Sequence, residues 1–210
     1  AAALALPDAE QLERLLERGP VRLKLVVTPQ FKGQGESGNV IAEVPGSDPT
    51  AGIVLIGGHL DSWDLGTGAI DDASGVAITA AAAKLIMDAG QPRRTIRVVW
   101  FGAEEPGGFG GEAYAKAHAG ERHVVAAESD FGADRVWQTG NSFAASNRAL
   151  SDRIAAALAP LGIAPASATP GHFGTDVQPT NALGVAGLSL EQSGLRYFDY
   201  HHTPDDTLDK

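Results

Sequence analysis

The chain has 210 residues, 43% of them hydrophobic, which is enough to bury one sizeable core. Acidic residues outnumber basic ones by 26 to 16, giving a formal net charge of −10, and the basic residues form no cluster. We therefore expect no nucleic acid and no anionic membrane as a partner. The chain has no cysteine, which excludes disulfides and thiolate metal sites, and no apolar run long enough to span a membrane.

The first forty residues predict a helix followed by an antiparallel pair of strands. Residues 8–18 place leucines on one face and charges on the other, which indicates an amphipathic helix. Residues 21–27, "VRLKLVV", alternate as a half-buried strand does, and residues 39–44 form a second such stretch after a polar, glycine-rich turn.

The rest of the chain alternates apolar strands with helices. The strands expected to be buried on both faces lie at residues 53–58, 95–103, 123–130 and 185–192. Helices are expected over residues 71–87, 112–119, 147–162 and 174–184. This order predicts an α/β fold, a three-layer αβα sandwich around a mostly parallel mixed sheet.

Acids and histidines follow every one of these strands. They are His59 and Asp61, Glu104 and Glu105, Glu128 and Asp130, and the stretch "YHHTPDD" that ends with Asp206. Ligands of such sheets bind outside the carboxyl ends of the strands, so these side chains are expected to gather at one edge. So many carboxylates together would repel one another unless a cation lay among them.

The residue types predict which cation that is. Histidine and carboxylate ligands without cysteine suit zinc, with Mn²⁺ or Co²⁺ as substitutes. A catalytic zinc needs three protein ligands and a water, whereas five or more candidates suggest two ions that share a carboxylate. The sequence therefore predicts a centre for two Zn²⁺ ions.

Four ordered motifs resemble the co-catalytic dizinc aminopeptidase family, which includes bacterial leucyl aminopeptidases and a carboxypeptidase Q branch. They are "GGHLDSWDLGTGAIDDASG", "AEEPGGFG", "ESD" and "HHTPDDT", within residues 39–207. The "HLDSW" form and the paired histidines resemble the carboxypeptidase Q branch most. The resemblance implies a zinc-dependent exopeptidase fold and a metallopeptidase activity.

The resemblance also implies roles for single residues. Asp71 would bridge the two metals, with His59 and Asp130 completing one site and Glu105 and His202 the other. Glu104 would be the general base for a metal-bridging water, and Asp61 would accept the second ring N–H of His59. His201 stands where many members have a tyrosine that binds the developing oxyanion, and an imidazole could donate the same hydrogen bond.

Several positions keep an alternative. Asp71 and Asp72 could cap the helix that follows them, and Asp72 is expected to do only that. Glu128 could replace Asp130 as a ligand, because residues two apart on a strand share a face. His201 could exchange roles with His202.

The expected function is hydrolysis of the terminal bond of short peptides or dipeptides, by an aminopeptidase, carboxypeptidase or dipeptidase. The alternatives are a single-zinc aminoacyl transferase of the glutaminyl cyclase kind and a catalytically silent binding domain of the same fold. Residues 1–20 resemble the tail of a protease-associated insert, and residues 21–210 a catalytic domain without its flanking terminal helices. No signal peptide is visible, so export to the periplasm or outside the cell is implied only by the branch resembled. The oligomeric state stays open, with a homodimer as one option.

Overall fold

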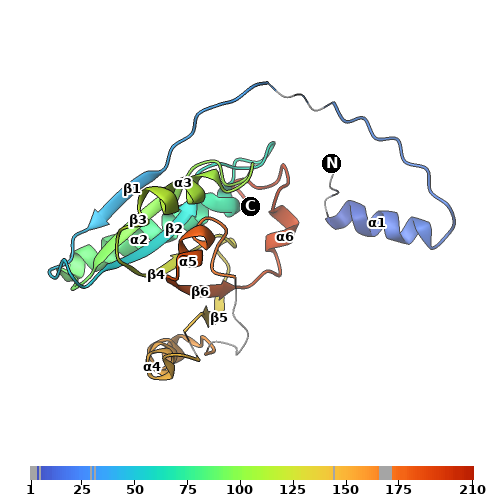
Figure 1. Cartoon of the computed structure of the whole chain (residues 1–210). Helices are drawn as coiled ribbons and strands as arrows, with labels where there is room; N and C mark the ends of the chain where they lie inside the picture. The colour runs from blue at the N-terminus through green and yellow to red at the C-terminus, as the bar shows by residue number, and fades with distance from the viewer. Residues whose placement is uncertain (1–3, 5, 29, 31, 144, 166–171) are drawn as a thin grey trace.

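The computed structural model describes residues 4, 6–28, 30, 32–143, 145–165 and 172–210. Its centre is one six-stranded sheet with the strand order β1-β3-β2-β4-β6-β5 (Figure 1). The strands are β1 (Val40–Val44), β2 (Ile53–His59), β3 (Thr95–Phe101), β4 (His123–Glu128), β5 (Val136–Asn141) and β6 (Ala186–Gln192).

The four inner strands run parallel, and the two edge strands run against them. β3, β2, β4 and β6 pair in parallel, whereas β1 pairs antiparallel with β3 and β5 antiparallel with β6. The inner strands are the apolar ones, as a sheet covered on both faces requires. The predicted mostly parallel mixed sheet is confirmed.

Helices lie on both faces of the sheet and make three layers. The helices are α1 (Leu6–Leu16), α2 (Ser74–Ala89), α3 (Phe109–Ala117), α4 (Arg148–Leu158), α5 (Gln178–Ala182) and α6 (Tyr197–Tyr200). Two further helical turns occupy Ala69–Ala73 and Ala159–Leu161. No helix within the described part of the chain is long and apolar enough to cross a membrane.

The alternation of side chains along β3 divides the core in two. Ile96 and Val98 pack with Ala83 of α2 on one face, and Val99 packs with Tyr114 of α3 on the other. Successive strand residues point to opposite faces, so one strand serves both halves of the core. The sheet is therefore held from both sides, and its carboxyl ends are rigid supports for a site.

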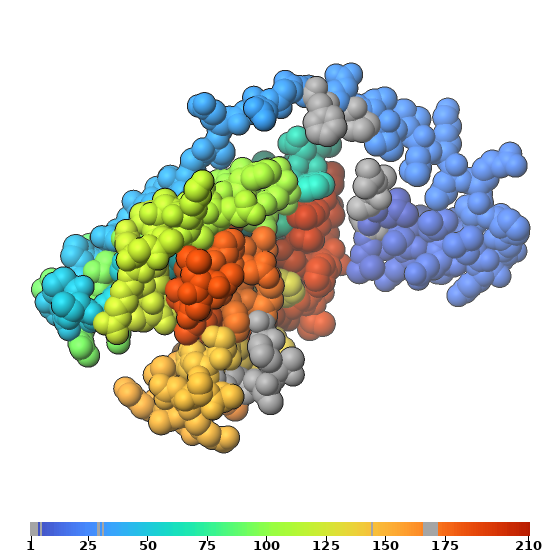
Figure 2. All heavy atoms as spheres, in the orientation of Figure 1, coloured from blue at the N-terminus to red at the C-terminus, as the bar shows by residue number. Residues whose placement is uncertain are grey.

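The prediction of a strand over residues 21–27 is wrong. These residues belong to an extended arm that runs from α1 to β1 outside the folded body (Figures 1 and 2). Leu23 and Leu25 are 58% and 66% exposed, so no sheet or helix covers the apolar side of the alternation. Two elements were not predicted from the sequence. They are β5, which precedes β6 in the chain, and α6, which follows it.

The helix predicted from residue 71 begins later, at Ser74. Asp71 and Asp72 have non-helical backbone angles within the turn Ala69–Ala73. Both carboxylates are consequently presented by an irregular turn beside the end of β2 and not by a regular helix.

Candidate metal centre

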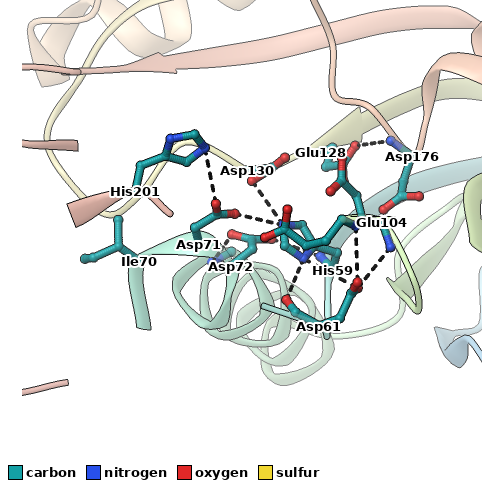
Figure 3. Close-up of polar contacts among 12 residues, drawn as sticks. His59, Asp61, Ile70, Asp71, Asp72, Glu104, Glu128, Asp130, Asp176 and His201 are labelled. Carbon is teal, nitrogen blue, oxygen red and sulfur yellow. Dashed lines mark hydrogen bonds and ion pairs between the residues drawn. The ribbon is translucent and has the colours of Figure 1, made fainter. Parts of the chain in front are cut away.

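Acidic and histidine side chains meet at the carboxyl ends of the parallel strands (Figure 3). His59 is the last residue of β2, Glu104 and Glu105 follow β3, and Asp130 follows β4. His59 and Asp71 are buried, at 1% and 4% exposed, whereas His202 is exposed, so the site has a buried side at His59 and an open side at His202. Most of the residues predicted from the sequence are thus brought together as expected for an open α/β sheet.

The carboxylate of Asp71 divides these side chains into two groups. Its Oδ1 lies 2.9 Å from Nε2 of His59, and its Oδ2 lies 3.2 Å from Nε2 of His202. Asp130 Oδ1 is 3.5 Å from the same His59 nitrogen, and Glu105 Oε2 is 3.1 Å from the same His202 nitrogen. The two oxygens of Asp71 therefore face different histidines, and each of these histidines also lies beside a second carboxylate.

The donors fit divalent metal ions. Ligand atoms within 4.8 Å of one another come from three sets: His59, Asp71 and Glu105; His59, Asp72 and Asp130; and Asp71, His201 and His202. Glu105 Oε1 is buried and has no hydrogen-bond partner within the described structure. Imidazole nitrogens with carboxylate oxygens are a donor set that zinc prefers, and an ion would satisfy the unpartnered oxygen.

The protonation equilibria at the site also call for positive charge. Burial, with the negative charge of Asp71, raises the pKa of Glu105 to about 7. Burial and the charge of Asp130 raise the pKa of Asp72 to about 8. Burial alone would lower the pKa of His59, but its hydrogen bonds to Asp130 and Asp71 raise it to about 12. Asp72 and Glu105 thus hold protons more tightly because carboxylates lie close together here, and a divalent cation could replace these protons.

The turn that carries Asp71 is held from the far end of the chain. Asp206 is buried, and its Oδ1 accepts a hydrogen bond from the Ile70 amide at 2.6 Å while its Oδ2 accepts one from the Asp71 amide at 3.2 Å. No role was expected for Asp206. Its only signal in the sequence was its place in "HHTPDDT", four residues after the candidate ligand His202.

Asp72 behaves as the capping residue that the sequence predicted. Its Oδ1 accepts a hydrogen bond from the amide of Gly75 in the first turn of α2, at 3.0 Å. Its Oδ2 accepts one from the amide of His59, also at 3.0 Å. The side chain therefore joins the start of α2 to the end of β2.

Asp61 does not make the contact that the resemblance implied. The ring Nδ1 of His59 lies 2.9 Å from the backbone carbonyl of Asp61, and 3.8 Å from its carboxylate, beyond hydrogen-bonding distance. An Nδ1–H bonded to that carbonyl leaves Nε2 as the metal-binding nitrogen. The carboxylate instead accepts hydrogen bonds from the backbone N–H groups of Glu104 and Glu105, at 3.0 and 3.1 Å.

The geometry favours Asp130 over Glu128 as a ligand. Glu128 Oε2 accepts hydrogen bonds from the amides of Asp176 and Val177 and so faces away from His59. Burial holds the pKa of Glu128 well above its ordinary value. Glu128 and Asp176 support the wall of the site, and no motif in the sequence pointed to Asp176.

The geometry likewise favours His202 over His201. His201 Nε2 is 3.4 Å from Asp71 Oδ2, but only His202 also lies beside Glu105. The two rings are stacked with centroids 3.7 Å apart. Trp63 stacks on the other face of His202 at 4.7 Å and an interplanar angle of 12°. His202 is therefore held between two aromatic rings.

Comparison with known proteins assigns the family. Residues 39–210 match the model of peptidase family M28. The chain belongs to this family. It is 35% identical over 213 residues to carboxypeptidase Q of Rattus norvegicus, with 99% of this chain and 44% of that protein covered. The resemblance to the zinc aminopeptidases near carboxypeptidase Q is confirmed, and the family places the chain among the metallopeptidases.

Solved structures share the fold. The crystal structure of a peptidase M28 precursor from Shewanella amazonensis superimposes with a TM-score of 0.83 at 47% identity, covering 97% of this chain and 47% of that one. A zinc aminopeptidase from Bacillus subtilis superimposes with a TM-score of 0.64 at 23% identity, over 81% and 44% of the two chains, which is a likeness of fold. The chain thus spans somewhat less than half the length of these relatives.

Proposed function

We propose that this chain forms the catalytic part of a dizinc exopeptidase that hydrolyses the terminal bond of short peptides or dipeptides. The observation that carries the proposal is the position of Asp71, whose two oxygens face the ring nitrogens of two different histidines, His59 and His202. His59 and Asp130 would hold one ion with Oδ1 of Asp71, and Glu105 and His202 would hold the other with Oδ2. The carboxypeptidase Q and zinc aminopeptidase relatives support this reading.

Two zinc ions held at this centre would polarise the scissile carbonyl and lower the pKa of a water molecule. Glu104 would take a proton from that water on its side-chain carboxylate and return it to the leaving amine. Burial raises the pKa of Glu104, which brings it closer to neutral pH and makes it a better base. Adjacent residues that leave a strand point in different directions, so Glu104 and Glu105 can serve the water and a metal separately.

His201 would donate a hydrogen bond to the oxygen of the tetrahedral intermediate. Burial, with the positive charge of His202, lowers the pKa of His201, so its ring is neutral at neutral pH and still carries one N–H donor. Such a donor stabilises the negative charge that develops on the carbonyl oxygen.

The test is a panel of aminoacyl chromogenic substrates and dipeptides, assayed with bound metal, after treatment with a chelator, and after zinc is restored. We expect activity that the chelator abolishes and zinc recovers, with two zinc ions per chain by elemental analysis. One tight zinc per fully active chain would contradict the two-metal centre. No hydrolysis in any arm would instead favour a binding domain of the same fold.

The boundaries and the location of the whole protein follow from the same resemblance. We propose that residues 1–20 belong to an insert or linker and residues 21–210 to the catalytic domain, and that the whole protein is exported. α1 has no buried residue among those described, which supports a division between it and the sheet domain.

A further inference from the structure

The carboxylate of Asp61 contacts the backbone on both sides of one peptide bond. Oδ1 accepts a hydrogen bond from the backbone N–H of Glu104 at 3.0 Å, and Oδ2 accepts one from the backbone N–H of Glu105 at 3.1 Å. Each oxygen thus holds a different one of two successive amides. Hydrogen bonds to an ionised acceptor are stronger than neutral ones, so the pair strongly restricts the position of this peptide.

The segment it contacts needs such support. Ala103, just before Glu104, has a φ of 59°, which puts a residue with a side chain in the left-handed region. After it, the Glu104 carbonyl accepts the amides of Gly107 and Gly108, and the Ala103 carbonyl accepts that of Phe109. The chain therefore reverses tightly between β3 and α3, with the two glutamates at the point of reversal.

The loop that carries Asp61 is anchored to the ends of two neighbouring strands, β2 and β3. The amide of Leu60 donates to the carbonyl of Phe101 at the end of β3. The Asp61 carbonyl lies 2.9 Å from Nδ1 of His59 at the end of β2. Asp61 thus contacts His59 through its backbone and the glutamate turn through its side chain, and these two contacts can be separated by substitution.

We propose that Asp61 is a positioning residue whose carboxylate clamps the Glu104–Glu105 peptide, so that Glu104 faces the substrate and Glu105 faces His202. The inference rests on the proposed function for the roles of the two glutamates. The clamp itself is a statement about two backbone amides. It differs from the role implied by the resemblance, in which the Asp61 carboxylate orients the His59 ring.

The variant Asp61→Asn tests the clamp. The amide side chain keeps the size of aspartate and leaves the backbone carbonyl that meets His59, but it has one acceptor oxygen instead of two. Its NH₂ group would then face one of the two backbone N–H groups, donor against donor. Asp64→Asn, an exposed aspartate in the same loop, is the matched control.

The first measurement is amide hydrogen exchange by NMR on metal-free protein. We expect the amides of Glu104 and Glu105 to be protected in the unsubstituted protein, and to exchange about tenfold faster in Asp61→Asn, as the loss of a hydrogen bond to a charged group predicts. Asp64→Asn should leave both amides unchanged. Fast exchange of both amides before any substitution, or no change in Asp61→Asn, would overturn the clamp. Because it needs neither metal nor substrate, this measurement stands even if the protein proves to have no peptidase activity.

The second measurement follows zinc affinity and steady-state kinetics in the same two variants. We expect Asp61→Asn to bind zinc about tenfold or more weakly, the range seen for supporting residues around metal ligands, and to lose kcat with little change in KM. Faster exchange with zinc affinity and kcat unchanged would reduce Asp61 to a loop-stabilising residue and contradict the positioning role.

Discussion

Two neighbouring glutamates, Glu104 and Glu105, differ in the side chains that they contact. Glu105 Oε2 lies 3.1 Å from His202, within the group that would hold a metal. The pKa of Glu104 is raised by burial and lowered by the charge of His59. Under the proposed function, the same backbone reversal would supply a metal ligand, Glu105, and a general base, Glu104, from adjacent positions.

Glu104→Gln separates these two roles. The substitution keeps the size of the side chain but removes the group that accepts a proton, so we expect kcat to fall by about 10²- to 10⁴-fold. Zinc content should not change, because Glu105 and not Glu104 contacts His202. Elemental analysis and steady-state kinetics measure the two effects, with Glu112→Gln, at an exposed position of α3, as the control. Activity in Glu104→Gln equal to that of the control would refute the assignment of the base.

Trp63 is expected to matter for metal binding although it has no ligand atom. Its ring stacks on His202 at 4.7 Å, so Trp63→Ala removes one of the two rings that hold this histidine. We expect zinc affinity to fall about tenfold or more, as for other supporting residues. Competition with a chromophoric chelator measures it, and Trp137→Ala, an exposed position on β5, is the control. Equal affinities in the two variants would show that the stacking does not support the site.

At Gly75, the second residue of α2, the helix approaches the end of β4 too closely for a side chain. A Cβ on Gly75 would lie 1.7 Å from the carbonyl oxygen of Ser129 and 2.4 Å from Asp72 Oδ1. Gly75 thus lets the helix sit directly beside two residues that shape the centre.

We expect Gly75→Ala to destabilise the protein by roughly 1–3 kcal/mol or more, because overpacking forces the backbone to shift. Thermal or denaturant unfolding measures the change. Gly120→Ala is the control, since a Cβ there meets nothing within 4 Å. A loss in Gly75→Ala no larger than in the control would contradict this account of the packing.

The sequence predicted the inner elements well and the outer ones poorly. β2 and β3 are nearly continuous apolar runs, interrupted in β3 by Arg97, so burial on both faces could be predicted from residue type. β5, "VWQTGN", has no such run and is a strand because β6 offers it an edge. Residues 21–27 alternate as a strand does but pair with no strand, because pairing depends on a partner that the alternation does not specify.

The candidate site shows the same limit. The motifs placed His59, Asp71, Glu105 and His202 correctly at one edge, because the ends of parallel strands meet there. They did not predict which atom of Asp61 meets His59, or that Asp206 holds the turn of Asp71. Such contacts depend on loop conformation, which spacing in the sequence does not determine.

The pH dependence of the stability of the protein is expected to differ between its metal-free and its zinc-bound forms. Asp72 and Glu105 bind protons more tightly when folded, with pKa values of about 8 and about 7 against ordinary values of 3.8 and 4.5. Their protonated forms stabilise the metal-free fold at acid pH, and this contribution is lost as the pH rises through that window. The raised pKa of His59 acts in the same direction above its ordinary 6.5.

We therefore expect the Tm of the chelated protein to fall between about pH 5 and about pH 8. The increase in Tm on adding zinc should grow over the same range, because ligands must lose their protons to bind metal. Differential scanning calorimetry with and without chelator measures both. A zinc-induced increase that is largest at acid pH would contradict the assignment of these carboxylates and histidines as ligands.

The hold of Asp206 on Asp71, across 135 positions of sequence, also affects how the protein is made. Until the segment around Asp206 has been synthesised and has folded back, the amides of Ile70 and Asp71 lack these two hydrogen bonds, and the Asp71 carboxylate has no fixed place. The candidate centre would then form last, after β2 and β3 have already paired. A peptidase with this contact would become active only after the chain had been synthesised as far as Asp206. Proteolytic cleavage in that segment would inactivate it.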